Sequence, residues 1–175
     1  MTLISIEMVT YLMRKFVFIV ASIYLCAFGQ FARADSNLQA AYELFRNQDY
    51  SAALPKFQIS AQQGNPESQV YLAIMYFSGL GTLVDLGKAF SWMRLAAEQG
   101  HLSAQYRVGL AHLGGMGTPV DYLRAHMWIN VAEMRGFKDT AHLLKGLASV
   151  MTPQQVVQAQ KMASDCLAKN FKGCD

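Results

Sequence analysis

The chain has 175 residues, of which 53% are hydrophobic and 15% are charged, and its formal net charge is +3 at pH 7. From Asp35 onward, 12 Lys and Arg residues are balanced by 11 Asp and Glu residues. No strong field therefore remains to attract nucleic acid or an anionic membrane, and we expect neither as a partner. The length is enough for one domain with an adequate hydrophobic core.

Residues 1–34 have the pattern of a cleaved export signal. The basic segment 13–15 precedes an apolar run over 16–28, and the Ala-Arg-Ala sequence at 32–34 has the small-x-small form of a signal-peptidase site. The run is shorter than the roughly 20 apolar residues that a membrane helix needs. We predict cleavage before Asp35, a periplasmic or secreted protein, and no stable membrane insertion after cleavage. An uncleaved anchor is the alternative, and Met13 is an alternative translation start.

Residues 35–64 are predicted to form a first pair of helices. Four residues here lie 36 positions before similar residues of the next unit, namely Asp49, Ala53, Phe57 and Gly64 before Asp85, Ala89, Met93 and Gly100. The glycine-containing insertion of the later units is missing, so residues 46–48 are expected to form a tight turn.

Residues 65–100 and 101–136 repeat one pattern with a period of 36 residues. Identical residues recur in register as Gly79/Gly115, Gly81/Gly117, Thr82/Thr118, Asp85/Asp121, Ala89/Ala125, Trp92/Trp128, Ala96/Ala132 and Gly100/Gly136. A period in this range is typical of stacked helical repeats, in which each unit buries its apolar face against its neighbours. The sequence therefore predicts an all-α fold, a short right-handed α-solenoid of about four helix-turn-helix repeats.

Within each repeat, the pattern indicates two helices joined by a loop. Gly79 supplies the left-handed conformation that ends a helix, and Asp85 is placed to cap the next one. Trp92 and Trp128 lie on the apolar face of the second helices, so we expect them to pack between layers. A phosphate-binding Gly-x-Gly loop would need a preceding strand, which favours helix capping here.

Residues 137–175 are predicted to form a degenerate capping repeat that ends in a helix over 156–169. Cys166 and Cys174 are the only cysteines after the export signal, and an even count in an exported chain favours a disulfide. Such a bridge would contribute about 2–3 kcal/mol by restricting the unfolded chain. Free thiols or a redox pair are the alternative.

The shared motif G-x-G-T-x-x-D-x-x-x-A-x-x-W-x-x-x-A-x-x-x-G resembles that of the Sel-1-like repeat family, a relative of the tetratricopeptide repeat. Residues 35–64 are similar to a plain tetratricopeptide repeat. His112, at the usual tyrosine, and Lys56, at a tryptophan position, depart from the pattern. The resemblance implies a non-enzymatic adaptor that holds a protein or peptide partner in the bacterial envelope.

If the first helices line the concave face, as in tetratricopeptide arrays, eight apolar side chains are candidates for partner binding: Tyr42, Phe45, Val70, Ile74, Phe77, Tyr106, Leu110 and Leu113. A groove of this kind would suit an amphipathic helix or an extended apolar peptide. The alternative is that these side chains are core, because helical stripes are usually buried. Self-association through the same surface is a further alternative.

The sequence contains no recognisable catalytic motif, and we expect no enzymatic activity, cofactor or metal. The four histidines, His101, His112, His126 and His142, form no pair at the spacing that places two imidazoles on one helix face. Copper binding near His126 and hydrolytic activity are weaker alternatives. Some relatives with a disulfide in each repeat are linked to cell-wall peptide binding, but residues 65–136 contain no cysteine.

Overall fold

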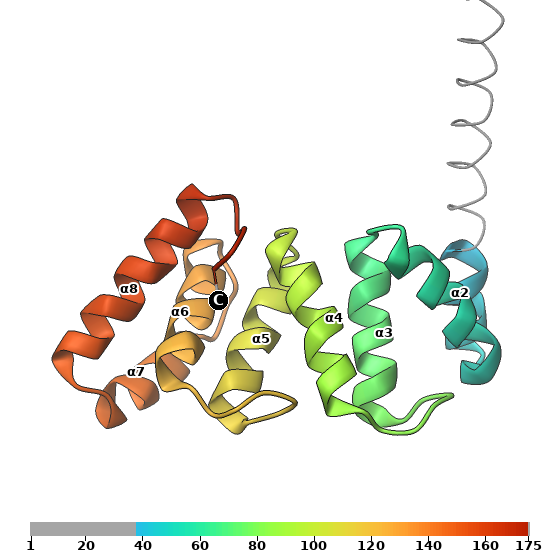
Figure 1. The fold of residues 1–175 in the computed structure, drawn as a ribbon, viewed down its shortest axis with the longest axis horizontal. Coiled ribbons are helices and arrows are strands. Elements are labelled where there is room, and N and C mark those ends of the chain that lie inside the picture. Colours follow the sequence, from blue (N-terminus) through green and yellow to red (C-terminus); the bar gives the residue numbers. More distant parts are fainter. Residues whose placement is uncertain (1–37, 175) are drawn as a thin grey trace, which may run out of the picture.

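The computed structural model describes residues 38–174, and the regular structure in this range is entirely helical (Figure 1). A helical segment at 38–46 is followed by α2 (Tyr50–Gln62), α3 (Pro66–Ser78), α4 (Leu86–Glu98), α5 (Leu102–Gly114), α6 (Tyr122–Met134), α7 (Ala141–Val150) and α8 (Pro153–Ala168). The predicted export signal lies outside the described residues. None of the helices within 38–174 combines the length and apolar character needed to cross a membrane.

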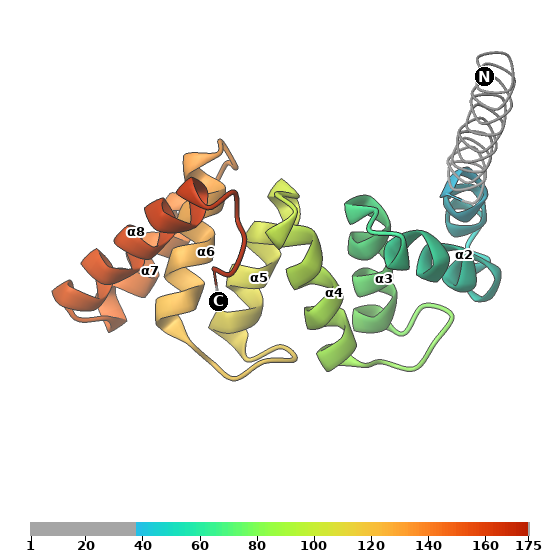
Figure 2. The same ribbon diagram turned by 45° about the horizontal axis from the view of Figure 1, so that its top comes forward.

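The helices stack in chain order into an elongated array, which is visible in both views (Figures 1 and 2). Each helix from α2 to α5 packs against the next, and α6 packs against both α7 and α8. The prediction of an all-helical solenoid is therefore confirmed.

Local sequence signals set the helix boundaries. Asn65, Asp85 and Asp121 each accept a hydrogen bond from the backbone amide three residues on, at 2.8–2.9 Å, which satisfies an amide that the helix leaves unpaired. Gly79 and Gly115 end α3 and α5 in the left-handed conformation, with φ of 69° and 68°. The predicted caps are confirmed, and they fix the length of each helix in the array.

A ladder of buried amides connects successive repeats. The Gln69 side chain donates to the carbonyl oxygen of Ala61 and accepts a hydrogen bond from Gln99 at 2.7 Å. Gln105 takes the same place one repeat later and accepts from Arg135 at 2.8 Å. Because each amide is buried and bonded both to the preceding unit and to the end of its own unit, the ladder fixes how one repeat sits on the next.

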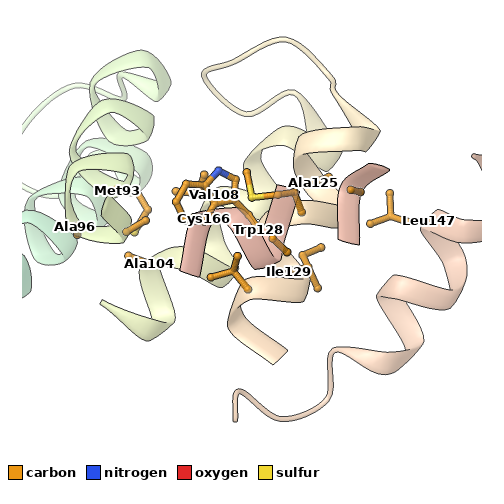
Figure 3. Close-up of a cluster of buried hydrophobic side chains, with 14 of the residues drawn as sticks. Met93, Ala96, Ala104, Val108, Ala125, Trp128, Ile129, Leu147 and Cys166 are labelled. Carbon is orange, nitrogen blue, oxygen red and sulfur yellow. The ribbon is translucent and has the colours of Figure 1, made fainter. Parts of the chain in front are cut away.

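The largest core cluster surrounds Trp128 (Figure 3). Trp128 is fully buried, whereas Trp92 is only partly buried. The difference arises because α6 is covered by α5, α7 and α8, while α4 packs mainly against α3 and α5. The expected burial between layers therefore holds fully for Trp128 and in part for Trp92.

Cys166 and Cys174 form the predicted disulfide. It closes a loop in which the Phe171 ring lies 4.6 Å from the guanidinium of Arg135. The bridge thus holds the end of the chain against the end of α6.

Removing this disulfide should lower the free energy of unfolding by about 2–3 kcal/mol, because the unfolded chain regains the freedom that the closed loop removes. Cys174→Ser is the suitable variant, since Cys166 is buried and Cys174 is only partly so. Urea unfolding of the oxidised protein and the variant measures the difference. A reductant should bring the parent protein to the midpoint of the variant and leave the variant unchanged; an unshifted midpoint in both cases would contradict a stabilising role.

Candidate functional site

A pocket of about 350 Å³ opens between α3, α4 and α5. Its walls are mainly apolar and include Ile74 and Phe77 from α3, Phe90 and Met93 from α4, and Arg107 and Leu110 from α5. Largely apolar concavities with a few polar groups are the usual form of a binding site. This pocket is therefore the candidate binding site within the part of the chain that the structure describes.

The structure brings three of the eight predicted partner-binding residues together at this pocket: Ile74, Phe77 and Leu110. Phe77 is 49% exposed, so its ring is available at the surface.

The other five candidates lie elsewhere. Val70 is buried in the main core and offers no surface. Tyr42 and Phe45 pack in an aromatic cluster between the first and second units. Tyr106 stacks on Phe137 with ring centroids 4.4 Å apart, and Leu113 packs against the main core. The eight candidate side chains do not form one continuous surface, because successive helices cover most of them.

Three successive units can be aligned on the last residues of their first helices, Arg46, Ser78 and Gly114. This alignment gives equivalent positions at the three interfaces between units. The first interface then has Tyr42, Phe45, Phe57 and Tyr71. The second has Ile74, Phe77, Met93 and Arg107 at the same positions, and the third has Leu110, Leu113, Ile129 and Leu143. In the first, the four rings contact one another with centroids 5.0–6.0 Å apart. In the third, the last three side chains pack in the main core.

The pocket lies at the second of these interfaces, where flexible side chains replace the rings. Met93 stands in the place of Phe57, and Arg107 stands in the place of Tyr71. An arginine keeps its charged head in water while its stem lies along apolar surface. Arg107 is exposed and lines the pocket without filling it, whereas a tyrosine ring at this position would fill it.

Sequence reasoning missed the contributions of Phe90, Met93, Arg107 and Met116 to this site. The signal that could have revealed them is the change from ring to flexible side chain at equivalent positions of successive repeats. It is visible only when the first unit is aligned through its shorter turn.

Arg107 is the one charged residue that lines the pocket. Among the described residues it forms no ion pair, whereas Asp85, at the start of the adjacent α4, is paired with Lys88 at 3.2 Å. The backbone amide and the side chain of Lys88 lower the pKa of Asp85, so this carboxylate remains ionised and partnered. The electrostatic character of the pocket itself is therefore positive.

Two histidines occupy positions that are aromatic in the preceding repeat. His112 replaces Tyr76 and contacts the Phe90 ring edge-on at 5.3 Å. His126 replaces Phe90, is 3% exposed, and has a buried Nδ1 with no hydrogen-bond partner among the described residues. Within residues 38–174, His, Cys, Asp and Glu side chains do not gather in a group that could hold a metal ion.

The stability of the protein should fall as the pH drops below about 6.5, in part through His126. Burial lowers the pKa of this histidine, and a backbone hydrogen bond and the nearby Glu133 offset that effect only in part. The unfolded chain, with a histidine pKa of about 6.5, then takes up a proton that the folded chain does not. This contribution to stability is complete above pH 6.5 and is lost progressively as the pH falls towards the folded pKa.

His126→Phe, which installs the side chain of the equivalent position 90, removes that proton uptake. Urea unfolding at pH 7.5 and pH 5.5 should show a smaller loss of stability in the variant than in the parent protein. The other histidines are common to both proteins and cancel in this comparison. Equal losses would show that His126 does not contribute.

The sequence of residues 66–101, and again that of 102–137, matches the Sel1 repeat family. The chain contains two Sel1 repeats. Sel1-repeat proteins are a non-enzymatic scaffold family and generally mediate protein–protein interactions. No curated protein matches the sequence.

Two solved structures of Sel1-like-repeat proteins resemble the array. One is a protective antigen present in uropathogenic Escherichia coli strains that displays an SLR fold; it is 25% identical, with a TM-score of 0.72, over 81% of this chain and 31% of its own. The present chain thus spans about a third of that antigen. The other is a Sel1 repeat protein from Oxalobacter formigenes, 26% identical, with a TM-score of 0.59, over 66% of this chain and 93% of its own.

Proposed function

We propose that this protein is an exported, non-enzymatic scaffold of the bacterial envelope that holds a protein partner through the pocket between α3, α4 and α5. The observation that carries the proposal is the pocket itself, an open apolar cavity of about 350 Å³ built by the Sel1 repeats. The partner-mediating role of Sel1-repeat proteins supports this use of it.

The pocket is suited to anchoring a partner because its walls are held in place before binding. The helices around it are fixed by caps at Asn65 and Asp85 and by the amide ladder through Gln69 and Gln105. A preformed site avoids part of the entropy loss on binding. Burial of one large apolar side chain in it would contribute about 1.5–3 kcal/mol.

Two observations support export. The pattern of residues 1–34 is that of a signal peptide, and the disulfide between Cys166 and Cys174 is of the kind that persists in oxidising compartments. Fractionation followed by N-terminal sequencing tests this part of the proposal. Protein in the periplasm or medium that begins at Asp35 would support it, and protein confined to the cytoplasm would contradict it.

Partner capture from intact envelope tests the scaffold role. Phe77→Asp places a carboxylate at the half-exposed mouth of the pocket, where it should be tolerated by the fold, and Gln160→Asp makes a matched change on the exposed side of α8. After crosslinking and affinity purification, recovery of the partner should fall at least tenfold with Phe77→Asp and remain unchanged with Gln160→Asp. Circular dichroism and urea unfolding verify that both are folded. Equal capture by all three proteins would exclude the pocket as the partner site.

A further inference from the structure

We infer that the pocket takes an aromatic side chain from a partner segment that carries an acidic residue beside it, and that Arg107 binds this carboxylate. The inference rests on the proposed function, because it describes the chemistry of the partner at the same site.

The preference for an aromatic side chain follows from the first interface. There, Phe57 and Tyr71 stack with an interplanar angle of 2° and centroids 5.0 Å apart, and Phe45 meets the Tyr71 ring edge-on. In the second interface both stacked rings are missing, since Met93 and Arg107 stand in their places. The space that opens lies where this fold accommodates aromatic rings.

The walls of the pocket offer the contacts that such a ring prefers. Phe77, at the position of Phe45, retains an exposed ring, and Phe90, which is partly buried, adds a second ring to the wall. Aromatic pairs in edge-on or offset contact contribute about 0.5–1.5 kcal/mol beyond area burial, and the thioether of Met93 makes favourable contacts with ring edges. An aliphatic side chain would gain only the area burial.

The preference for a neighbouring carboxylate follows from Arg107. Its guanidinium is exposed, forms no ion pair with a described residue, and is the sole charge that lines the pocket. A guanidinium binds a carboxylate through two parallel hydrogen bonds. A segment anchored by its ring would bring an adjacent Asp or Glu to this group, whereas a Lys or Arg would be repelled.

Selection from a phage-displayed library of random 12-residue peptides tests the inference, with the full chain as the cell produces it as bait. The unmodified protein should enrich sequences in which Phe, Tyr or Trp stands next to Asp or Glu. Arg107→Lys should keep this preference, and Arg107→Glu should replace the acidic residue by Lys or Arg. Lys138→Glu, an exposed charge outside the pocket, is the control and should select as the parent does.

A second variant closes the pocket with the rings of the first interface. Met93→Phe/Arg107→Tyr should be as stable as the parent in urea and should bind a synthetic peptide of the selected sequence at least tenfold more weakly. Fluorescence anisotropy measures this affinity. An undiminished affinity would place the peptide elsewhere and overturn the inference.

Other outcomes separate the inference from the proposed function. Enrichment without an acidic neighbour, an acidic preference that survives Arg107→Glu, or no enrichment at all would overturn the inference. The proposed function would still stand if envelope capture remained dependent on Phe77. A second copy of the chain in the pocket would also overturn the inference. It would appear in sedimentation as a dimer, which Met93→Phe/Arg107→Tyr would convert to a monomer.

Discussion

Gly117→Ala should lower the free energy of unfolding by about 2–5 kcal/mol, although it adds a single methyl group in a loop. Gly117 has φ of 76°, and a Cβ atom built on it would lie 2.0 Å from the carbonyl oxygen of Leu86 and 3.0 Å from the Cβ of Phe90. The loop between α5 and α6 therefore rests directly on the start of α4. Because the obstacle is backbone, no side-chain rotation relieves it, and the two repeats must separate.

Gly136→Ala is the matched control for this substitution. Gly136 also has a positive φ, 88°, but a Cβ atom there would have no other atom within 4 Å. Its replacement should cost only the left-handed backbone strain, about 1–2 kcal/mol. Urea unfolding of both variants measures the difference, which is the contribution of loop packing between repeats. Equal losses of stability would show that the loop can withdraw from α4 without penalty.

Trp128→Ala should lower the free energy of unfolding by about 3–5 kcal/mol, because it removes the largest fully buried side chain and leaves a cavity between α5, α6 and α8. Val108, Ile129 and Cys166 lie around this ring in the core cluster (Figure 3). These neighbours come from three helices, so local rearrangement cannot fill the space.

Trp92→Ala makes the identical change one repeat earlier, where the ring is only partly buried. It should cost about 1–2 kcal/mol, since less apolar area is removed from contact. Thermal or urea unfolding of the two variants ranks them. A larger loss for Trp92→Ala would contradict the view that the C-terminal helices complete the core around the second Sel1 repeat.

The fold could be predicted from the sequence because its determinants are local and repeated. The glycine at 79 and the aspartate at 85 act within a few residues of their own positions, and the recurrence of the pattern after one period fixes the stacking. The sequence pattern predicts a capping role for the second glycine of each loop. Gly81 and Gly117 instead allow the loop to contact the preceding unit, an interaction between repeats that a local pattern does not reveal.

The candidate site could be predicted only in part, because it depends on contacts between helices. Ile74 and Phe77 of α3 and Leu110, at the position of Ile74 on α5, meet at the pocket, but the same stretch of α3 buries Val70. Met93 of α4 and Arg107 of α5 also line the pocket, and their flexible side chains, in place of the rings of the first interface, leave it open. Gln69 and Gln105 were likewise not predicted, since polar residues are usually exposed and these two are buried in the amide ladder.

Site-specific photo-crosslinking in living cells shows directly whether a partner protein lies in the pocket. A photoreactive phenylalanine analogue at position 77 reports on the mouth of the pocket, and the same analogue at position 160 reports on the exposed side of α8. A discrete adduct with another protein is expected from position 77 and should be abolished by Met93→Phe/Arg107→Tyr, and no adduct is expected from position 160. No adduct from position 77, or an adduct that persists after the pocket is filled, would contradict partner binding in the pocket.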